Sequence, residues 1–316
     1  MSVKNASDAT IREMHKRAQE QGITTVWERE ELQTPHCGFG TLGICCKNCN
    51  LGPCRIDPFG EGPQVGVCGA DADVIAARNL LRHIAAGSAC HNDHGREINR
   101  AFQLTAKGQA QSYEFKDEEK LKRVAQEYGV AIENKKINAI ALELSQKIFA
   151  EFGQQEGELK LVHRAPKKQI DIWRKNGIMP RGIDREIIEA LTRTNVGVDN
   201  DYQSLMMSGM RVAMTDGWGG SMIATELSDI LFRSPRPIGT KANLGVLKQD
   251  EVNVIVHGHV PLLSDMICQA SQDSEILALA QKKGAKGVNV AGICCTALEV
   301  LARRGVNVAG NFLHRS

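Results

Sequence analysis

Apolar side chains recur at helical spacing through most of the first 232 residues. The segment beginning ADADVIAARNLLRHIAAG has apolar positions at 74, 75, 77, 80, 81, 84 and 85, which form one face of a helix. Asp71 and Asp73 precede this face, and either is suited to cap the helix. Similar patterns predict further helices at 7–33, 117–128, 136–152, 166–176, 184–194, 200–215 and 220–232, with a surface loop at 153–160.

The pattern changes after the SPRP sequence at 234–237, which ends the last of these helices. Val252–Val256 and Gly287–Ala291 read as buried strands, each followed by a helix, and Val306–Ala309 begins a third strand. The second of these helices is expected at Thr296–Arg304. This order predicts a Rossmann-like parallel sheet. The fold class is therefore α+β overall, with an all-helical domain at 1–235 followed by the start of a Rossmann-like parallel α/β domain at 236–316.

Six cysteines stand in the glycine-rich run from 37 to 68, a density that needs a chemical explanation. Four thiolates at short spacing can hold an iron–sulfur cluster or zinc. Cys46, Cys49, Cys54 and Cys68 make one complete set of ligands, which leaves Cys37 and Cys45 as half of a second set.

Two alternatives to an iron–sulfur cluster stay open on spacing alone. Structural zinc usually joins two C-x2-C knuckles, whereas this run contains a single knuckle, at Cys46 and Cys49. Disulfides are the third possibility, but ten cysteines without an export signal indicate a reducing cytoplasm. The isolated Cys90 and Cys268 are expected to be small buried apolar residues.

Charge and hydropathy exclude several classes of partner. The formal net charge is +2, which gives no electrostatic case for nucleic acid. No apolar run reaches the 18 residues of a transmembrane candidate, so no transmembrane helix is expected. The cysteine content points to the cytoplasm.

A second group of candidate ligands follows the two predicted strands. His257 and His259 come after the first strand, and Cys294 and Cys295 come after the second. The carboxyl ends of parallel strands meet at one edge, where ligands bind. A shared metal site and an ordinary role in turns or caps both remain open for these residues.

With these motifs in view, the sequence resembles the catalytic subunit of nickel-containing anaerobic carbon monoxide dehydrogenase, from about Cys37 to Val308. Hybrid cluster proteins resemble this family in the cysteine loop and the fold. The motifs that carry the resemblance are GICCKNCNLGPCRI, VCGADADVIAARN, AAGSACHNDHGREI, VGVDNDYQSLMMSGMRVAMTD, IATELSDILF, VNVIVHGHVPLLSD and GAKGVNVAGICCT.

The resemblance implies three metal clusters. Cys46, Cys49, Cys54 and Cys68 would bind a [4Fe–4S] cluster within the subunit. Cys37 and Cys45 would share a second [4Fe–4S] cluster with the same pair of a homodimer partner, and a [2Fe–2S] form stays open there. His259 and Cys295 would bind part of a Ni-Fe-S cluster.

The implied activity is the reversible oxidation of CO with water to CO2, two protons and two electrons. His91 resembles a family histidine that contacts substrate and moves protons, and His94 would follow it on the same helix. The family often has four histidines spaced three residues apart along this helix, a ladder on one face. At the third and fourth positions the present chain has Glu97 and Arg100. A second departure is the sequence GICCTALE, which replaces GICCTGNE.

The resemblance covers about the first half of the family's subunit, so the chain is expected to be truncated and inactive by itself. It also implies a ferredoxin-like electron carrier as partner and leaves an acetyl-CoA synthase subunit open as another. Two alternative functions remain: a non-catalytic iron–sulfur module for electron transfer or regulation, and a hybrid-cluster-type protein.

Overall fold

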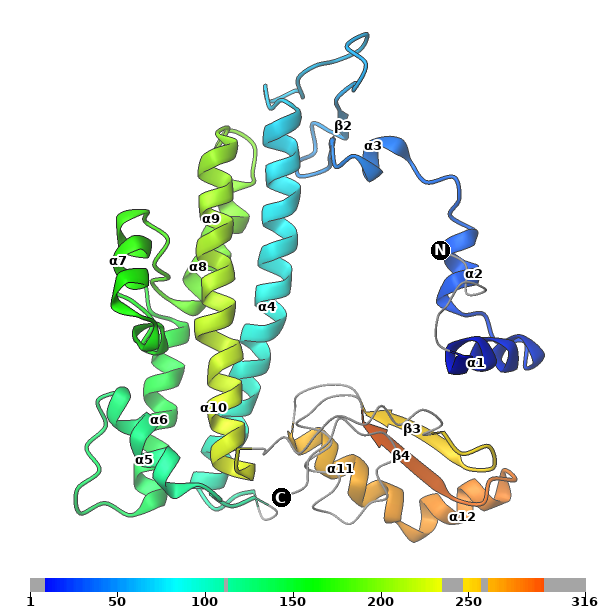
Figure 1. Cartoon of the computed structure of the whole chain (residues 1–316), viewed down its shortest axis with the longest axis vertical. Coiled ribbons are helices and arrows are strands. Elements are labelled where there is room, and N and C mark those ends of the chain that lie inside the picture. Colours follow the sequence, from blue (N-terminus) through cyan, green and yellow to red (C-terminus); the bar gives the residue numbers. More distant parts are fainter. Residues whose placement is uncertain (1–8, 111–112, 235–246, 257–260, 293–316) are drawn as a thin grey trace.

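The computed structural model describes residues 9–110, 113–234, 247–256 and 261–292. A bundle of long helices carries the cysteine loop at one end, and a small sheet with two helices follows in sequence (Figure 1). The elements are α1 (Ala9–Glu20), α2 (Val26–Glu31), α3 (Gly38–Thr41), β1 (Cys45–Cys46), β2 (Cys54–Arg55), α4 (Ala72–Ala106), α5 (Glu118–Glu127), α6 (Ile137–Phe152), the 3-10 helix η2 (Leu161–Arg164), α7 (Lys167–Lys175), α8 (Ile183–Arg193), α9 (Tyr202–Thr215), the π-helix η3 (Asp216–Gly220), α10 (Ser221–Phe232), β3 (Val252–Val256), α11 (Pro261–Gln272), α12 (Ser274–Lys282) and β4 (Val288–Gly292).

Helix α4 organises the bundle. It has 35 residues, and the Asp71 side chain caps it by accepting a hydrogen bond from the Val74 amide at 2.9 Å. The helix packs against α6, α8, α9 and α10. Phe102 of α4 is fully buried with Ile140 and Leu144 of α6 in the larger apolar core. A second core joins the start of α4 to the cysteine loop through Ile56 and Ala70.

Most helices predicted from the sequence are confirmed to within two residues at each end. The prediction of a single helix at 7–33 is wrong in its described part, because the helix is interrupted between α1 and α2. Gly22 has a φ of +68° there, and Thr25 and Glu28 form a capping box that starts α2. The cysteine loop is also not purely helical, since β1 and β2 form a short antiparallel pair.

The predicted strands at Val252–Val256 and Gly287–Ala291 are confirmed as β3 and β4 within one residue, and they pair in parallel. Helices α11 and α12 lie between them in sequence. Val256 is paired with Gly292, so the carboxyl ends of both strands coincide. The fold is α+β overall. The expected third strand at Val306–Ala309 and the helix at Thr296–Arg304 lie outside the described residues, and no helix within the described part is long and apolar enough to cross a membrane.

Candidate functional site

Four cysteines of the loop line one pocket. Cys46 and Cys54 are paired across β1 and β2, and Cys49 and Cys68 complete the set. The glycines make this arrangement possible, because a Cβ on Gly52 would lie 3.0 Å from the Cys54 nitrogen and one on Gly66 would lie 3.4 Å from the Cys54 sulfur. The other lining residues are Asn48, Gly52, Gly66, Val67, Ala70, Ile75, Arg78 and Val196.

Hydrogen-bond donors surround these sulfur atoms. The Val67 amide donates to Cys54 Sγ at 3.4 Å, and Arg78 Nη1 donates to Cys68 Sγ at 3.6 Å. Burial alone would raise the pKa of the Cys68 thiol, but the Ala70 amide and the Arg78 guanidinium outweigh it and lower that pKa below its ordinary value. The loop therefore favours a thiolate at Cys68, which is the form that binds metals.

Two buried donors at the pocket have no partner among the described residues. They are Nδ2 of Asn48 and Nε of Arg78. Buried donors are normally hydrogen-bonded, so an acceptor bound in the pocket could satisfy both of them. The described part of the chain, the pocket included, contains no group of three or more His, Cys, Asp or Glu side chains placed to hold a single metal ion. All the cysteines in that part have free thiols.

Cys37 and Cys45 are not among the residues that line this pocket. Cys37 is exposed just before α3, where hydrogen bonds from the Gly40 and Phe39 amides lower the pKa of its thiol. Cys45 is half-buried. Asn79 of α4 fixes its backbone by donating from Nδ2 to the carbonyl oxygens of Gly43 and Cys45, at 2.9 and 3.0 Å.

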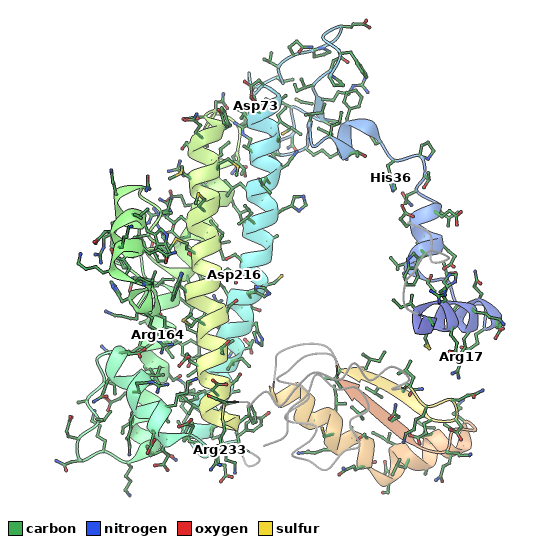
Figure 2. All side chains as sticks on the ribbon, in the orientation of Figure 1. Arg17, His36, Asp73, Arg164, Asp216 and Arg233 are labelled. Atoms are coloured by element: carbon green, nitrogen blue, oxygen red, sulfur yellow. The ribbon has the colours of Figure 1, made fainter. Side chains whose placement is uncertain are left out.

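His91 forms a pair with an acidic residue that the sequence analysis did not single out. Its Nδ1 lies 2.9 Å from Oδ2 of Asp216, the first residue of η3. Ser221 donates to Oδ1 of the same carboxylate at 2.6 Å. Asp216 lies partway along the helix formed by α9 and α10, well away from the cysteine loop (Figure 2). Because a carboxylate only accepts, the His91 proton sits on Nδ1 in the neutral ring, and Nε2 is left for other chemistry.

A close crossing of α4 and η3 holds this pair in place. A Cβ on Gly95 would lie 2.5 Å from the Gly220 carbonyl oxygen, so only glycine allows the two backbones to approach this far. The buried Asn92 accepts a hydrogen bond from the Gly220 amide at 2.9 Å. The π-helix thus begins with Asp216 and ends at this crossing, a placement often found at functional sites.

The later positions of the ladder behave differently from His91. His94 is half-buried on α4. Glu97 and Arg100 form an ion pair with each other, with 3.0 Å between Oε1 and Nη1. A proton that reaches Glu97 would therefore meet a carboxylate already engaged with a cation.

Of the remaining candidate ligands, His257, His259, Cys294 and Cys295 lie outside the described residues. Cys268 is buried as expected. The expectation for Cys90 is wrong, because this residue is exposed on α4 beside His91. The buried stripe of the helix passes through Ser88 and Asn92 instead, which turns Cys90 outward.

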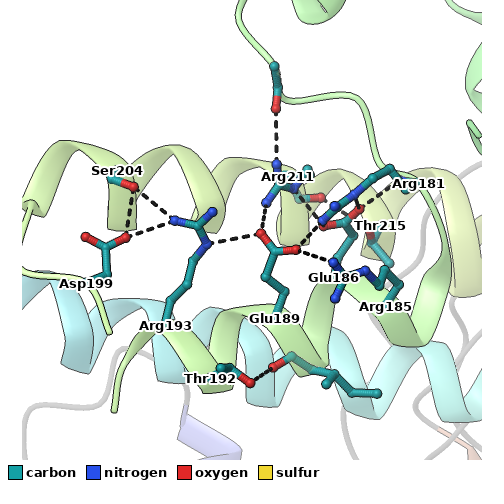
Figure 3. A network of polar contacts seen from close by, with 12 residues as sticks. Arg181, Arg185, Glu186, Glu189, Thr192, Arg193, Asp199, Ser204, Arg211 and Thr215 are labelled. Carbon is teal, nitrogen blue, oxygen red and sulfur yellow. Dashed lines mark hydrogen bonds and ion pairs between the residues drawn. The ribbon is translucent and has the colours of Figure 1, made fainter. Parts of the chain in front are cut away.

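A charged network holds the 194–201 segment, whose Val196 lines the cysteine pocket (Figure 3). Glu189 bridges Arg181, Arg193 and Arg211, and Arg193 also pairs with Asp199 at 2.9 Å. Ser204 of α9 donates to the same Asp199 oxygen at 2.8 Å. These bonds tie the 194–201 segment to α8 and α9.

The profile of the Prismane/CO dehydrogenase family matches residues 44–316, and the chain belongs to this family. A carbon monoxide dehydrogenase of Methanosarcina mazei is 54% identical over 308 residues, which is 98% of this chain and 49% of the relative. The chain thus spans about half the length of the curated relatives it matches.

Solved structures agree with the family. A nickel-free carbon monoxide dehydrogenase from Thermococcus sp. AM4 is 51% identical with a TM-score of 0.87, covering 98% of this chain and 49% of that one. A second structure, of acetyl-CoA synthase/carbon monoxide dehydrogenase with NiZn[Fe4S4] and NiNi[Fe4S4] clusters in its alpha subunits, is 39% identical with a TM-score of 0.84. It covers 98% of this chain and 46% of that one.

Proposed function

We propose that these residues belong to a nickel-containing carbon monoxide dehydrogenase, which converts CO and water to CO2, two protons and two electrons. The main observation behind this proposal is the pocket lined by Cys46, Cys49, Cys54 and Cys68. Buried donors on Asn48 and Arg78 lack partners there among the described residues. Family membership and the named relatives support the same reading.

The pocket is proposed to hold a [4Fe–4S] cluster, which supplies one-electron storage and transfer when bound. The four thiolates would be its ligands. Asn48 Nδ2 and Arg78 Nε would donate to its sulfides, and the Val67 amide would continue to donate to the Cys54 sulfur. Ile75 and Ala70 are buried at the pocket and would help to exclude water.

Cys37 and Cys45 are proposed to share a second cluster with the same pair of a homodimer partner, because two ligands make half a site and a two-fold axis doubles it. The cluster would be [4Fe–4S], with [2Fe–2S] as the alternative. Support comes from the apolar side chains that the loop exposes, which a partner would cover: Leu42, Leu51, Phe59, Val65 and Val67. Changing Cys37 to Ser should remove one cluster per dimer, whereas a loss of one per chain would contradict sharing.

The Ni-Fe-S cluster is proposed to take His259 and Cys295 as ligands and to be approached by His91. Support comes from the register of β3 and β4, whose carboxyl ends coincide. A Rossmann-like domain from 236 onward, after a helical domain at 1–235, is part of this proposal. A parallel pair with intervening helices is the unit from which such domains are built.

His91 is proposed as the catalytic acid–base group. Asp216 holds Nδ1, so Nε2 can accept a proton that water releases when its oxygen is added to CO. His94 would take part in the next transfer. Beyond it, the ion pair of Glu97 and Arg100 would have to open for Glu97 to carry a proton.

A ferredoxin-like carrier is the proposed electron acceptor, and an acetyl-CoA synthase subunit is a further candidate partner, because one structural neighbour contains both activities. We place the protein in the cytoplasm. The proposed use of the cysteines as metal ligands, and not in disulfides, is typical of a reducing compartment.

The test uses the full-length protein, purified without oxygen. We expect nickel and iron to be retained after gel filtration, together with CO-dependent reduction of a viologen dye. Changing His91 to Ala should lower kcat by roughly 10²–10⁴-fold, the usual effect of losing a general acid–base group. The exposed neighbour provides the control, Cys90→Ser, which should keep full activity.

The alternative function is a non-catalytic iron–sulfur module for electron transfer or regulation, or a hybrid-cluster-type protein. Iron retained without nickel, and no CO oxidation by the full-length protein, would favour that alternative and overturn our proposal.

A further inference from the structure

We infer that Arg78 raises the reduction potential of the cluster held by Cys46, Cys49, Cys54 and Cys68. This inference rests on the proposed presence of that cluster. Arg78 is 1% exposed and is the largest fully buried side chain among the described residues. It lies on the first turns of α4, ten residues after Cys68, and it lines the cysteine pocket.

Arg78 has an unusual set of partners for a buried cation. Its Nη2 donates to the Asp199 carbonyl oxygen at 2.7 Å and to Oδ1 of Asn200. Its Nη1 donates to Cys68 Sγ, and its Nε has no partner in the described part of the chain. No carboxylate there forms an ion pair with it, although the described arginines around Glu189 are all paired.

A buried guanidinium without a counter-charge is costly, so its environment must supply negative charge. The pocket is where that charge would come from. A cluster held by four thiolates is anionic, and its reduction adds one further negative charge. Arg78 therefore stabilises the reduced form more than the oxidised form, and a stabilised reduced form means a higher potential.

The Asp199 and Asn200 contacts keep Arg78 in this position. Asp199 is fixed in turn by Arg193 and Ser204, so a braced segment holds the guanidinium through Nη2. The two terminal nitrogens of the guanidinium therefore have separate partners: Nη2 contacts the 199–200 segment and Nη1 contacts Cys68. Lysine could keep the charge but not this pair of directed contacts.

The experiment is a redox titration of the full-length, cluster-loaded protein, followed by electron paramagnetic resonance. The signal of this cluster is identified by its absence after Cys49→Ser. For Arg78→Gln, we expect at least a tenfold lower ratio of reduced to oxidised cluster at a fixed potential, which corresponds to a fall of about 59 mV for a one-electron couple. Arg78→Lys should recover most of this shift, because it keeps the charge.

The matched control is Arg82→Gln, which removes the same charge one turn further along α4, at a residue that does not line the pocket. It should change the ratio by less than about threefold, because charge effects weaken with distance and solvent. Equal shifts for Arg78→Gln and Arg82→Gln, or an unchanged potential in Arg78→Gln with full iron content, would overturn the inference.

If Arg78→Gln does not retain iron, Asn200→Asp tests the same idea with the arginine in place. It gives Arg78 a carboxylate partner and should lower the potential. Asn195→Asp adds the same charge to the segment at a side chain that bonds the Leu191 carbonyl oxygen and not Arg78, so it should have less effect. Equal potentials in these two variants would contradict the inference. Absence of iron from the unaltered protein would instead refute the proposed cluster itself.

Discussion

The cysteine loop and the helical bundle are stabilised by different interactions. In the bundle, Phe102, Leu121, Ile140 and Leu144 are fully buried, so apolar contact supplies the stabilising free energy. In the loop, Phe59 is 84% exposed and Leu51 is 60% exposed. The loop has two strands of two residues each and attaches to the bundle through a small core. We therefore expect part of its stability to come from the proposed cluster and the proposed partner subunit.

The largest expected effect removes the bound group from the loop. Changing Cys49 to Ser should abolish the cluster at this site and expose the amides of residues 44–70 to rapid hydrogen exchange, because metal binding supplies on the order of 10 kcal/mol in small metal-dependent domains. The amides of α6 should stay protected. Iron analysis and exchange mass spectrometry measure both effects, and Cys90→Ser is the control that keeps the iron. Equal loss of protection in α6 would mean that loop and bundle fold as one unit.

The converse change damages the bundle core. Phe102→Ala should lower the free energy of unfolding by about 3–5 kcal/mol, because it leaves a cavity where the ring is fully buried. The folded fraction should still bind iron at the loop. Denaturant unfolding with parallel iron analysis gives the result, and a variant that folds stably but has lost its iron would contradict the separation of the two regions.

A matched pair of glycines tests the crossing that positions His91. Gly95→Ala should cost about 1–3 kcal/mol, because its Cβ would meet Gly220 and push α4 away from η3. Activity should fall as well, since Asp216 moves with η3. Gly87→Ala, on the same helix with no atom within 4 Å of the added Cβ, should instead stabilise by about 0.5–1 kcal/mol. Thermal unfolding of both variants is sufficient, and similar effects in the two would show that the crossing is not tight.

The smallest effect concerns the charged network around Glu189 of α8. Burial would raise the pKa of Glu189, but hydrogen bonds from Arg181 and Arg193 and the charge of Arg211 lower it to about 2. A lowered carboxyl pKa contributes stability above the unfolded value of about 4.3, and this contribution is lost as the pH falls toward 2.

The difference in unfolding free energy between the unaltered protein and Glu189→Gln should therefore be constant near neutral pH and shrink below about pH 4.5. Denaturant titrations over this range provide the measurement. Glu143→Gln is the control, because Glu143 lies in an exposed pair with Lys135. A difference that grows on acidification would mean that the network destabilises the bundle.

The long helices could be predicted because their apolar spacing persists over many turns, and Asp71 marks the start of α4 as expected. The β1–β2 pair could not, because strands of two residues have no period. Gly22 was a readable sign of the break between α1 and α2, since its φ of +68° suits glycine.

The site was only partly predictable. Spacing picked out the four cysteines that line the pocket, whereas Asp216 and Arg78 come from elsewhere in the sequence and were missed. Arg78 carried a signal: Val74, Ile75, Ala77 and Leu81 on either side of it are all buried, so a charge stood within an apolar stripe. Only three-dimensional contacts reveal what that charge faces.

Helix α4 fixes the distance between the cysteine pocket and the His91–Asp216 pair. Arg78 and His91 lie on one unbroken helix, 13 residues apart, which places them about 20 Å apart along its axis at the usual rise. One inserted residue between them would lengthen this spacing by about 1.5 Å and turn His91 by about 100° away from Asp216. Substitutions can be absorbed along this stretch, but insertions and deletions change distance and direction at once, so its length is a property on which both sites depend.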